Sequence, residues 1–258
     1  GEFLVSWLSE PPDPDFPMLL YRVFDETGMP RVDERMYFST DTVSSSWQMD
    51  ATAVHDGGYA VVYSTSVWET SSNRAVVHLQ FVDDHGVPPD SYYIVSDDTW
   101  NQDFPAVVSS PLGWLVVTWS QWEGASPPAP KNIVAKRMNQ DGTAHGSKYL
   151  VSTVEASYKM DPVTAVGPEG NMLSVWSVSV GMESEINARA LASNITPTGP
   201  VFQVNSHTED SQSLPDVAMD FDGSYVIVWM SQEQDGDASG IYMRRFDASG
   251  TPMTDEIQ

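Results

Sequence analysis

One pattern recurs five times along the chain of 258 residues and constrains the fold more than any other feature of the sequence. In each copy a glycine is followed, six residues later and across an apolar run, by Trp or Tyr. The copies are Gly1 to Trp7, Gly57 to Tyr63, Gly113 to Trp119, Gly170 to Trp176 and Gly223 to Trp229. Successive aromatic residues are therefore 56, 56, 57 and 53 positions apart, which indicates one structural unit repeated along the chain.

Each unit contains four short runs rich in Val, Ile, Tyr, Phe and Trp, separated by turn residues. Proline opens the first run in three units, at Pro105, Pro162 and Pro215, and the run from Gly to Trp or Tyr follows it. The third runs lie at 20–24, 76–81, 133–137, 186–191 and 241–246, and the fourth runs at 36–39, 93–96, 149–152 and 202–205. Because no window has the sustained spacing of three and four residues that marks an amphipathic helix, the runs predict β-strands.

A four-stranded unit of this length is typical of one blade of a β-propeller. The second runs are nearly all apolar, as expected for strands that are covered on both faces. We therefore expect one all-β domain over 1–258, a propeller of about five four-stranded blades, with repeats at 1–47, 48–101, 102–157, 158–206 and 207–258. The first copy begins at its second run, so the first blade should lack its inner strand, and we expect the chain to be a piece of a larger ring or array.

Charge and composition exclude several classes of function. The chain has 36 acidic and 12 basic residues, a formal net charge of -24, which argues against a nucleic-acid partner. The absence of Cys excludes disulfides and thiolate metal sites. No apolar run approaches the roughly 20 residues of a membrane span. Most arginines recur in the third runs, at Arg22, Arg137, Arg189, Arg244 and Arg245, and are expected to be structural.

The last unit carries a family resemblance. It contains Phe202-Gln-Val-Asn205, Asp222-Gly-Ser-Tyr-Val-Ile-Val-Trp229 and Gly240-Ile-Tyr-Met-Arg-Arg-Phe246. This unit resembles the repeats of large secreted or surface-exposed bacterial proteins, which often stand beside cadherin-like or hemolysin-type calcium-binding modules; the other units match in part. The resemblance implies a propeller-forming, non-catalytic array that is extracellular or at the cell surface, and it supplies no catalytic residues.

One loop of the last unit has the spacing of calcium ligands. Oxygen-bearing side chains alternate at Asp235, Asp237 and Ser239, as in the first half of a calcium loop. Met243 and Phe246 stand where later ligands would be needed. The loop is therefore either a calcium site or a flexible acidic turn.

The loops between the second and third runs differ most among the repeats, and variable loops on a rigid scaffold commonly carry function. Trp68 and Trp122 stand in these loops, outside the repeated aromatic position. An exposed indole stacks well on a sugar ring, so both are candidate glycan-binding residues. The alternative is that each folds back as a lid on the edge of its blade.

Acidic residues also recur near the start of the first run, at Asp50, Asp103, Asp161 and Asp216. These runs should line the central channel of a propeller, so the carboxylates are candidates for a ring at one mouth. Because side chains alternate along a strand, Asp161 and Asp216 should share a face that Asp103 does not. The alternative is that all are solvated acids at strand edges. Acids beside turn glycines, including Asp25, Asp83, Asp84, Asp141, Asp222 and Asp247, are expected to cap turns.

Two classes of function remain. The first is an extracellular, non-catalytic module for adhesion, assembly or ligand binding, with a glycan or protein partner on the loop face and calcium as the one candidate cofactor. Repetition favours this class, because scaffolds gain from copied units. The second is a carbohydrate-active enzyme of the glycosidase type, which needs two carboxylates placed around the scissile bond. The sequence favours the first class, and thus a protein that is not an enzyme.

Overall fold

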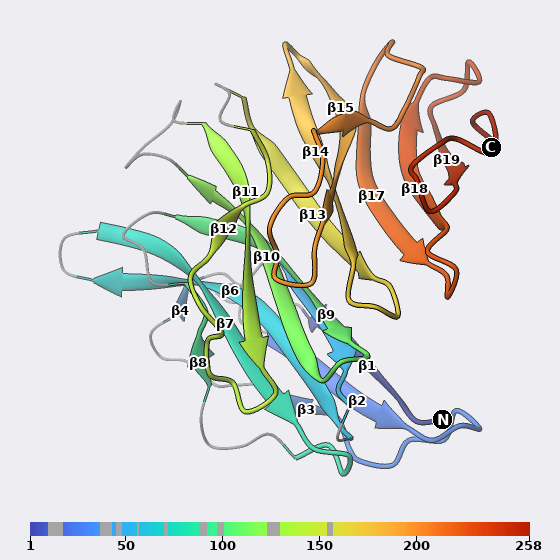
Figure 1. Ribbon diagram of the computed structural model, residues 1–258. Helices are drawn as coiled ribbons and strands as arrows, with labels where there is room; N and C mark the ends of the chain where they lie inside the picture. Colours follow the sequence, from blue (N-terminus) through green and yellow to red (C-terminus); the bar gives the residue numbers. More distant parts are fainter. Residues whose placement is uncertain are drawn as a thin grey trace.

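The computed structural model describes residues 1–9, 18–36, 43–44, 48–55, 57–69, 72–87, 92–96, 101–122, 130–153 and 157–258. Its regular elements are all β-strands, and they form five antiparallel sheets. Figure 1 shows the sheets following one another in chain order, from the blue sheet near the N-terminus to the orange and red sheet near the C-terminus. The described part of the chain contains no helix that could cross a membrane. The predicted all-β propeller of five blades is confirmed.

Each blade consists of strands that are consecutive in the sequence, numbered here from the N-terminus. Blade 1 contains β1 (Phe3–Ser9), β2 (Met18–Phe24) and β3 (Arg35–Met36). Blade 2 contains β5 (Met49–Ala53), β6 (Tyr59–Glu69), β7 (Ser72–Val82) and β8 (Tyr93–Ile94), with β4 (Val43–Ser44) paired to the far end of β6. Blade 3 contains β9 (Gln102–Ser110), β10 (Trp114–Trp122), β11 (Lys131–Asn139) and β12 (Tyr149–Leu150). Blade 4 contains β13 (Lys159–Val166), β14 (Met172–Val180), β15 (Glu183–Leu191) and β16 (Phe202–Gln203), and blade 5 contains β17 (Gln212–Met219), β18 (Tyr225–Gln232) and β19 (Ser239–Phe246).

The first strands of blades 2 to 5 form the inner wall. Strand β9 contacts β5 on one side and β13 on the other, and β13 contacts β17. Strand β1, which follows no inner strand in the described chain, occupies the second-strand position of blade 1, as its pairing with β2 shows. Among the residues that the structure describes, blade 1 therefore has no inner strand, as the sequence predicted.

The repeated aromatic residues of blades 3, 4 and 5 each pack against the blade before. Trp119, Trp176 and Trp229 are 0%, 0% and 1% exposed. Trp119 shares a buried cluster with Val62 of blade 2, Trp176 shares one with Val116 of blade 3, and Trp229 shares one with Val175 of blade 4. The core of the protein is thus a series of layers between blades, and burial of the repeated Trp or Tyr in each layer explains why the repeat keeps this position aromatic.

Cations from the third strands join neighbouring blades. Lys136 Nζ donates to the carbonyl of Val95 in blade 2 at 2.8 Å, and Arg189 Nη1 donates to that of Val151 in blade 3 at 2.9 Å. Arg244 Nη1 donates to the carbonyl of Val204 in blade 4 at 3.0 Å. These three cations occupy one repeat position, so the structural role expected for the third-strand arginines is confirmed for Arg189 and Arg244.

The two ends of the series differ from the middle. Phe3 and Val5 of β1, which lie on the same face as Trp7, are each 43% exposed, and Trp7 itself is partly exposed. At the other end, Ile241 of β19 is 64% exposed. Within the described chain, blades 1 and 5 therefore each keep one sheet face that is less covered than the faces of blades 2 to 4.

Candidate active site at the mouth of the central channel

A cavity of about 660 Å³ lies on the axis of the propeller, at the end where the inner strands begin. Residues of β5, β9, β13 and β17, together with Trp7 of β1, line it. Three carboxylates, those of Asp50, Asp161 and Asp216, belong to this lining, and Asp103 does not. Asp103 is nevertheless close enough to Asp161 for its carboxylate to raise the pKa of the Asp161 carboxyl, so a face shared by Asp161 and Asp216 without Asp103 stays a prediction.

A bulge repeated in three blades sets the direction of these side chains. The residue before each proline, Phe104, Asp161 or Leu214, has a positive φ of 54°, 52° or 52°, and the strand register shifts there. A bulge turns a strand and re-aims the side chains on either side of it. The repeated proline therefore marks the point at which each of these strands enters the channel wall.

Asp50 and Asp216 occupy the same position in two blades. Asp50 pairs with Val62, one residue before the repeated Tyr63, and Asp216 pairs with Val228, one residue before Trp229. Asp161 lies at the bulge itself. Asp161 thus comes from a different position of the repeat than Asp50 and Asp216 do.

Asp50 joins two blades. Its Oδ1 accepts the N–H of Ala51 at 2.8 Å, and its Oδ2 accepts the N–H of Val107 in blade 3 at 2.9 Å. Burial raises the pKa of the Asp50 carboxyl in spite of these bonds, and the Asp216 carboxylate raises it further. Both residues belong to the lining of the same cavity.

Asp161 is also a partly buried acid. Burial raises the pKa of its carboxyl, the Lys131 ammonium lowers it, and the Asp103 carboxylate raises it. The alternative that these acids are solvated at strand edges is therefore wrong for Asp50 and Asp161, whereas Asp216 is exposed. A carboxyl with a raised pKa beside a carboxylate in one cavity can exchange protons with a bound molecule.

Lys131 organises the wall next to the cavity. Its Nζ donates to Asp103 Oδ2 at 2.7 Å and lies 5.0 Å from the centre of the Phe104 ring and 4.8 Å from that of the Trp122 ring. Its side chain is 8% exposed, and burial raises the pKa of its partner Asp103. Sequence reasoning missed Lys131, because no other repeat places a cation at the corresponding position of its third strand.

The structure places the two candidate tryptophans in strands and not in loops. Trp122 is the last residue of β10, where it pairs with Lys131, and its ring meets that of Tyr158 edge-on at 5.8 Å. Trp68 lies within β6 and pairs with Asn73, and its side chain lies outside the described part of the chain. The loop assignment was wrong because both second strands extend further than the apolar run. Sugar binding by either residue stays a prediction.

The candidate calcium loop is exposed at Asp235, Asp237 and Ser239. Asp235 Oδ1 accepts the N–H of Asp237 at 3.0 Å, and its Oδ2 accepts the side-chain amide of Gln258 at 2.6 Å. These bonds are those of a capped turn, and calcium binding here stays a prediction.

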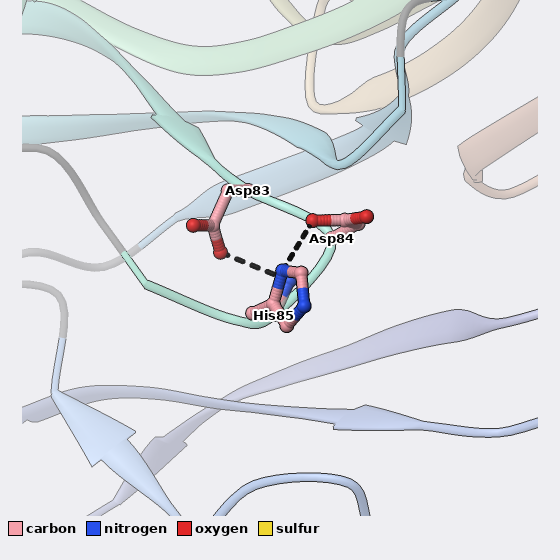
Figure 2. A group of neighbouring side chains, drawn as sticks. All are labelled: Asp83, Asp84 and His85. Carbon is pink, nitrogen blue, oxygen red and sulfur yellow. Dashed lines mark hydrogen bonds and ion pairs between the residues drawn. The ribbon is translucent and has the colours of Figure 1, made fainter.

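A second acidic group lies on the turn after β7. Figure 2 shows Asp83, Asp84 and His85, whose ligand atoms lie within 4.8 Å of one another, all of them exposed. Asp83 Oδ1 accepts the N–H groups of His85 and Val87 at 3.0 and 2.7 Å, and His85 Nδ1 lies 2.6 Å from Asp84 Oδ1. The same cap occurs at Asp25 and Asp247, so the expectation that turn acids are structural is confirmed for Asp83.

Comparison with known proteins supports the fold. No protein-family model matches the chain, and no curated protein sequence is similar to it. A protein of unknown function from Dyadobacter fermentans superposes with a TM-score of 0.69 at 10% identity, over 97% of this chain and 77% of that one. An α-L-arabinanase from Penicillium chrysogenum, solved with arabinobiose, gives 0.65 at 14% identity, over 99% and 76%. An endo-arabinase from Bacteroides thetaiotaomicron gives 0.56 at 15% identity, over 98% and 94%.

These similarities correct the function expected from the sequence. Two of the three superposed proteins are enzymes that act on carbohydrates, which contradicts the prediction of a non-catalytic adhesion or assembly module and favours the alternative. Repetition was the wrong guide, because it identifies the framework and does not show what the acids at its centre do. The resemblance to bacterial surface repeats is supported as far as the propeller, and an extracellular location stays a prediction.

Proposed function

We propose that this chain is a carbohydrate-active enzyme that cleaves a glycosidic bond at the mouth of the central channel. The observation that carries the proposal is the convergence of Asp50, Asp161 and Asp216, from three blades, on one cavity of about 660 Å³. A cavity of this size holds a few sugar units. The similarity in fold to arabinan-cleaving enzymes supports the same reading.

Hydrolysis of a glycoside requires one carboxyl that gives a proton and one carboxylate that activates water. Asp161 is our candidate acid, because burial raises the pKa of its carboxyl. Asp216 is our candidate base, because it is exposed at the cavity and reachable by water. Asp50 is a positioning residue: both of its oxygens accept backbone N–H groups, which fixes the carboxylate in the wall that joins blades 2 and 3.

In this scheme the Asp161 carboxyl gives its proton to the glycosidic oxygen as the bond from that oxygen to the anomeric carbon breaks. A water molecule adds to the anomeric carbon and gives its proton to Asp216. The products are two shorter sugars, and proton exchange with solvent restores both acids.

The charge of the site indicates the kind of sugar. The described lining of the cavity contains three carboxyl groups and neither Lys nor Arg. A uronate or sulfated sugar would be repelled there, so we propose a neutral glycan as the substrate. Proline and apolar side chains, including Trp7, Phe104 and Leu214, supply surfaces for the faces of sugar rings.

The test is release of reducing ends from a panel of neutral oligosaccharides, beginning with arabino-oligosaccharides. Asp161→Asn and Asp216→Asn should each lower the rate by roughly a hundredfold or more, the usual contribution of a general acid or base. Asp84→Asn, an exposed acid on a turn, is the matched control and should leave the rate unchanged.

Two outcomes would overturn the proposal. One is binding of a neutral oligosaccharide without any release of reducing ends. The other is release that persists in both Asp161→Asn and Asp216→Asn while each variant keeps the circular dichroism spectrum of the parent. Cleavage of an acidic polysaccharide in preference to neutral ones would overturn the substrate class alone.

A further inference from the structure

A second cavity lies at the opposite end of the inner strands, between blades 4 and 5. Its volume is about 640 Å³, and it shares no lining residue with the channel cavity. The turn between β13 and β14, the turn between β17 and β18, and the turns after β15 and β19 surround it. Its lining includes Asn171, Ala190, Phe202, Gly223, Tyr225 and Ala248.

The repeat shows what fills the corresponding space between blades 3 and 4. Trp114, directly after a turn glycine, is 4% exposed there, and the Arg137 guanidinium lies 4.5 Å from the centre of its ring. Arg137 Nη1 donates to the carbonyl of Ser193 in blade 4 at 3.2 Å. The indole lies so close to Gly170 of blade 4 that an added Cβ would meet it at 3.1 Å.

Between blades 4 and 5 the same positions hold much smaller side chains. Asn171 follows the turn glycine of blade 4 and corresponds to Trp114. Ala190 pairs with Leu173 as Arg137 pairs with Val116, so it corresponds to Arg137. An indole and a guanidinium are thus both missing from this layer.

Blade 5 has small residues at the positions where blade 4 contacts the indole of Trp114 and the guanidinium of Arg137. Gly223 corresponds to Gly170, and Ala248 corresponds to Ser193. A Cβ added at Gly223 would meet only the Ala248 side chain, at 3.2 Å, and backbone at 4.0 Å. The cavity is therefore the space that an aromatic ring and a cation occupy one blade earlier.

We propose that the cavity between blades 4 and 5 binds a small ligand made of a flat aromatic ring that carries a positive charge. Phe202, Met219 and Tyr225 give the cavity apolar walls for the ring. The exposed Glu169 carboxylate lies in its lining, and no Lys or Arg belongs to the described lining. The ammonium group of the ligand would stand where the guanidinium of Arg137 stands in the layer before.

The experiment measures binding of tryptamine, an indole with an ammonium group, by isothermal titration calorimetry and by ligand-observed NMR. Indole-3-acetate, with the same ring and a negative charge, is the comparison ligand. We expect tryptamine to bind at least about tenfold more tightly than indole-3-acetate. The double variant Asn171→Trp, Ala190→Arg should fill the cavity, lose tryptamine binding and melt at a higher temperature.

Matched variants keep the result interpretable. Ser224→Trp places a Trp at the same repeat position of blade 5, and Ser224 is not part of the lining, so this variant should bind tryptamine as the parent does. Asp161→Asn, in the other cavity, should also leave binding unchanged. If the double variant does not fold, Ala190→Arg alone serves the same purpose.

The proposal is wrong if the parent protein shows no binding of tryptamine at millimolar concentration. It is also wrong if the filled variants, folded by circular dichroism, bind tryptamine as tightly as Ser224→Trp does. Equal affinity for tryptamine and indole-3-acetate would overturn the assignment of a cationic ligand.

Discussion

The layers between blades predict that one amino-acid change has different costs at two copies of the same repeat position. Trp176 is 0% exposed and lies in a cluster with Val116, Ile133 and Val151 of blade 3. Trp7 occupies the same position of blade 1, where no earlier blade of the described chain provides such a layer, and it is partly exposed. Truncation to Ala should therefore cost much more at Trp176 than at Trp7.

The expected size follows from burial. Replacing a fully buried Trp by Ala lowers the free energy of unfolding by about 3–5 kcal/mol. The indole N–H of Trp176 has no hydrogen-bond partner among the described residues, so truncation to Ala also removes the free-energy cost of burying that N–H. The expected loss of unfolding free energy is therefore near the lower end of this range, about 3–4 kcal/mol. For a chain of this size that corresponds to a fall in Tm of roughly 6–16 °C. Trp7→Ala should cost less than about 2 kcal/mol, since much of the ring already meets solvent.

Urea unfolding followed by far-ultraviolet circular dichroism measures both variants, because a change of Trp would disturb a fluorescence signal. Trp229→Ala, in the next layer, is the positive control and should match Trp176→Ala, since Trp229 is 1% exposed. Equal losses of unfolding free energy in Trp7→Ala and Trp176→Ala would refute the argument, because the contribution of the ring would then not depend on its burial against the preceding blade.

Three further predictions concern the framework and the acids. Arg189→Met removes the hydrogen bonds that the guanidinium donates to the carbonyls of Val151 and Gly199, both at 2.9 Å. It should lower the free energy of unfolding, measured by urea denaturation, by about 2–3 kcal/mol, and Arg189→Lys should lower it less. Gly142→Ala should destabilise more than Gly146→Ala in thermal unfolding: both glycines have positive φ, of 81° and 87°, but only at Gly142 would the new Cβ overlap the ring of Tyr93. Because burial raises the pKa of Asp50, Asp103 and Asp161, the folded protein holds their protons more tightly than the unfolded chain, so Tm should rise as pH falls from 7 toward their ordinary value of 3.8. Below pH 3.8 Tm should fall again, because hydrogen bonds lower the pKa of turn carboxyls such as that of Asp247, and these carboxylates lose their stabilising effect when they become protonated. Asp50→Asn should flatten the rise in Tm between pH 7 and pH 3.8. A Tm that falls steadily as the pH is lowered from 7 would contradict the raised pKa values of the three buried acids.

The repeat was enough to predict the framework. A Gly followed by Trp or Tyr at near-constant spacing marks a unit that must bury both faces of a sheet, and only stacked blades satisfy that requirement. The proline column identified the inner strands of blades 3 to 5, although each of them begins three residues before its proline. These features are local, so a single unit of the sequence contains the information.

The candidate site depended on contacts that no single unit contains. Lys131 meets Asp103 and Trp122 because β11 folds back beside β10. Asp50 and Asp216 line one cavity because the ring brings blades 2 and 5 toward one axis. Trp122 was assigned to a loop because the length of a hairpin is decided by pairing across strands and not by its apolar run. The sequence by itself determined the blade and its repetition, since strand period and turn chemistry are local properties. Only the tertiary structure decided which acids become buried together, because that depends on how far each blade is rotated about the axis relative to the others.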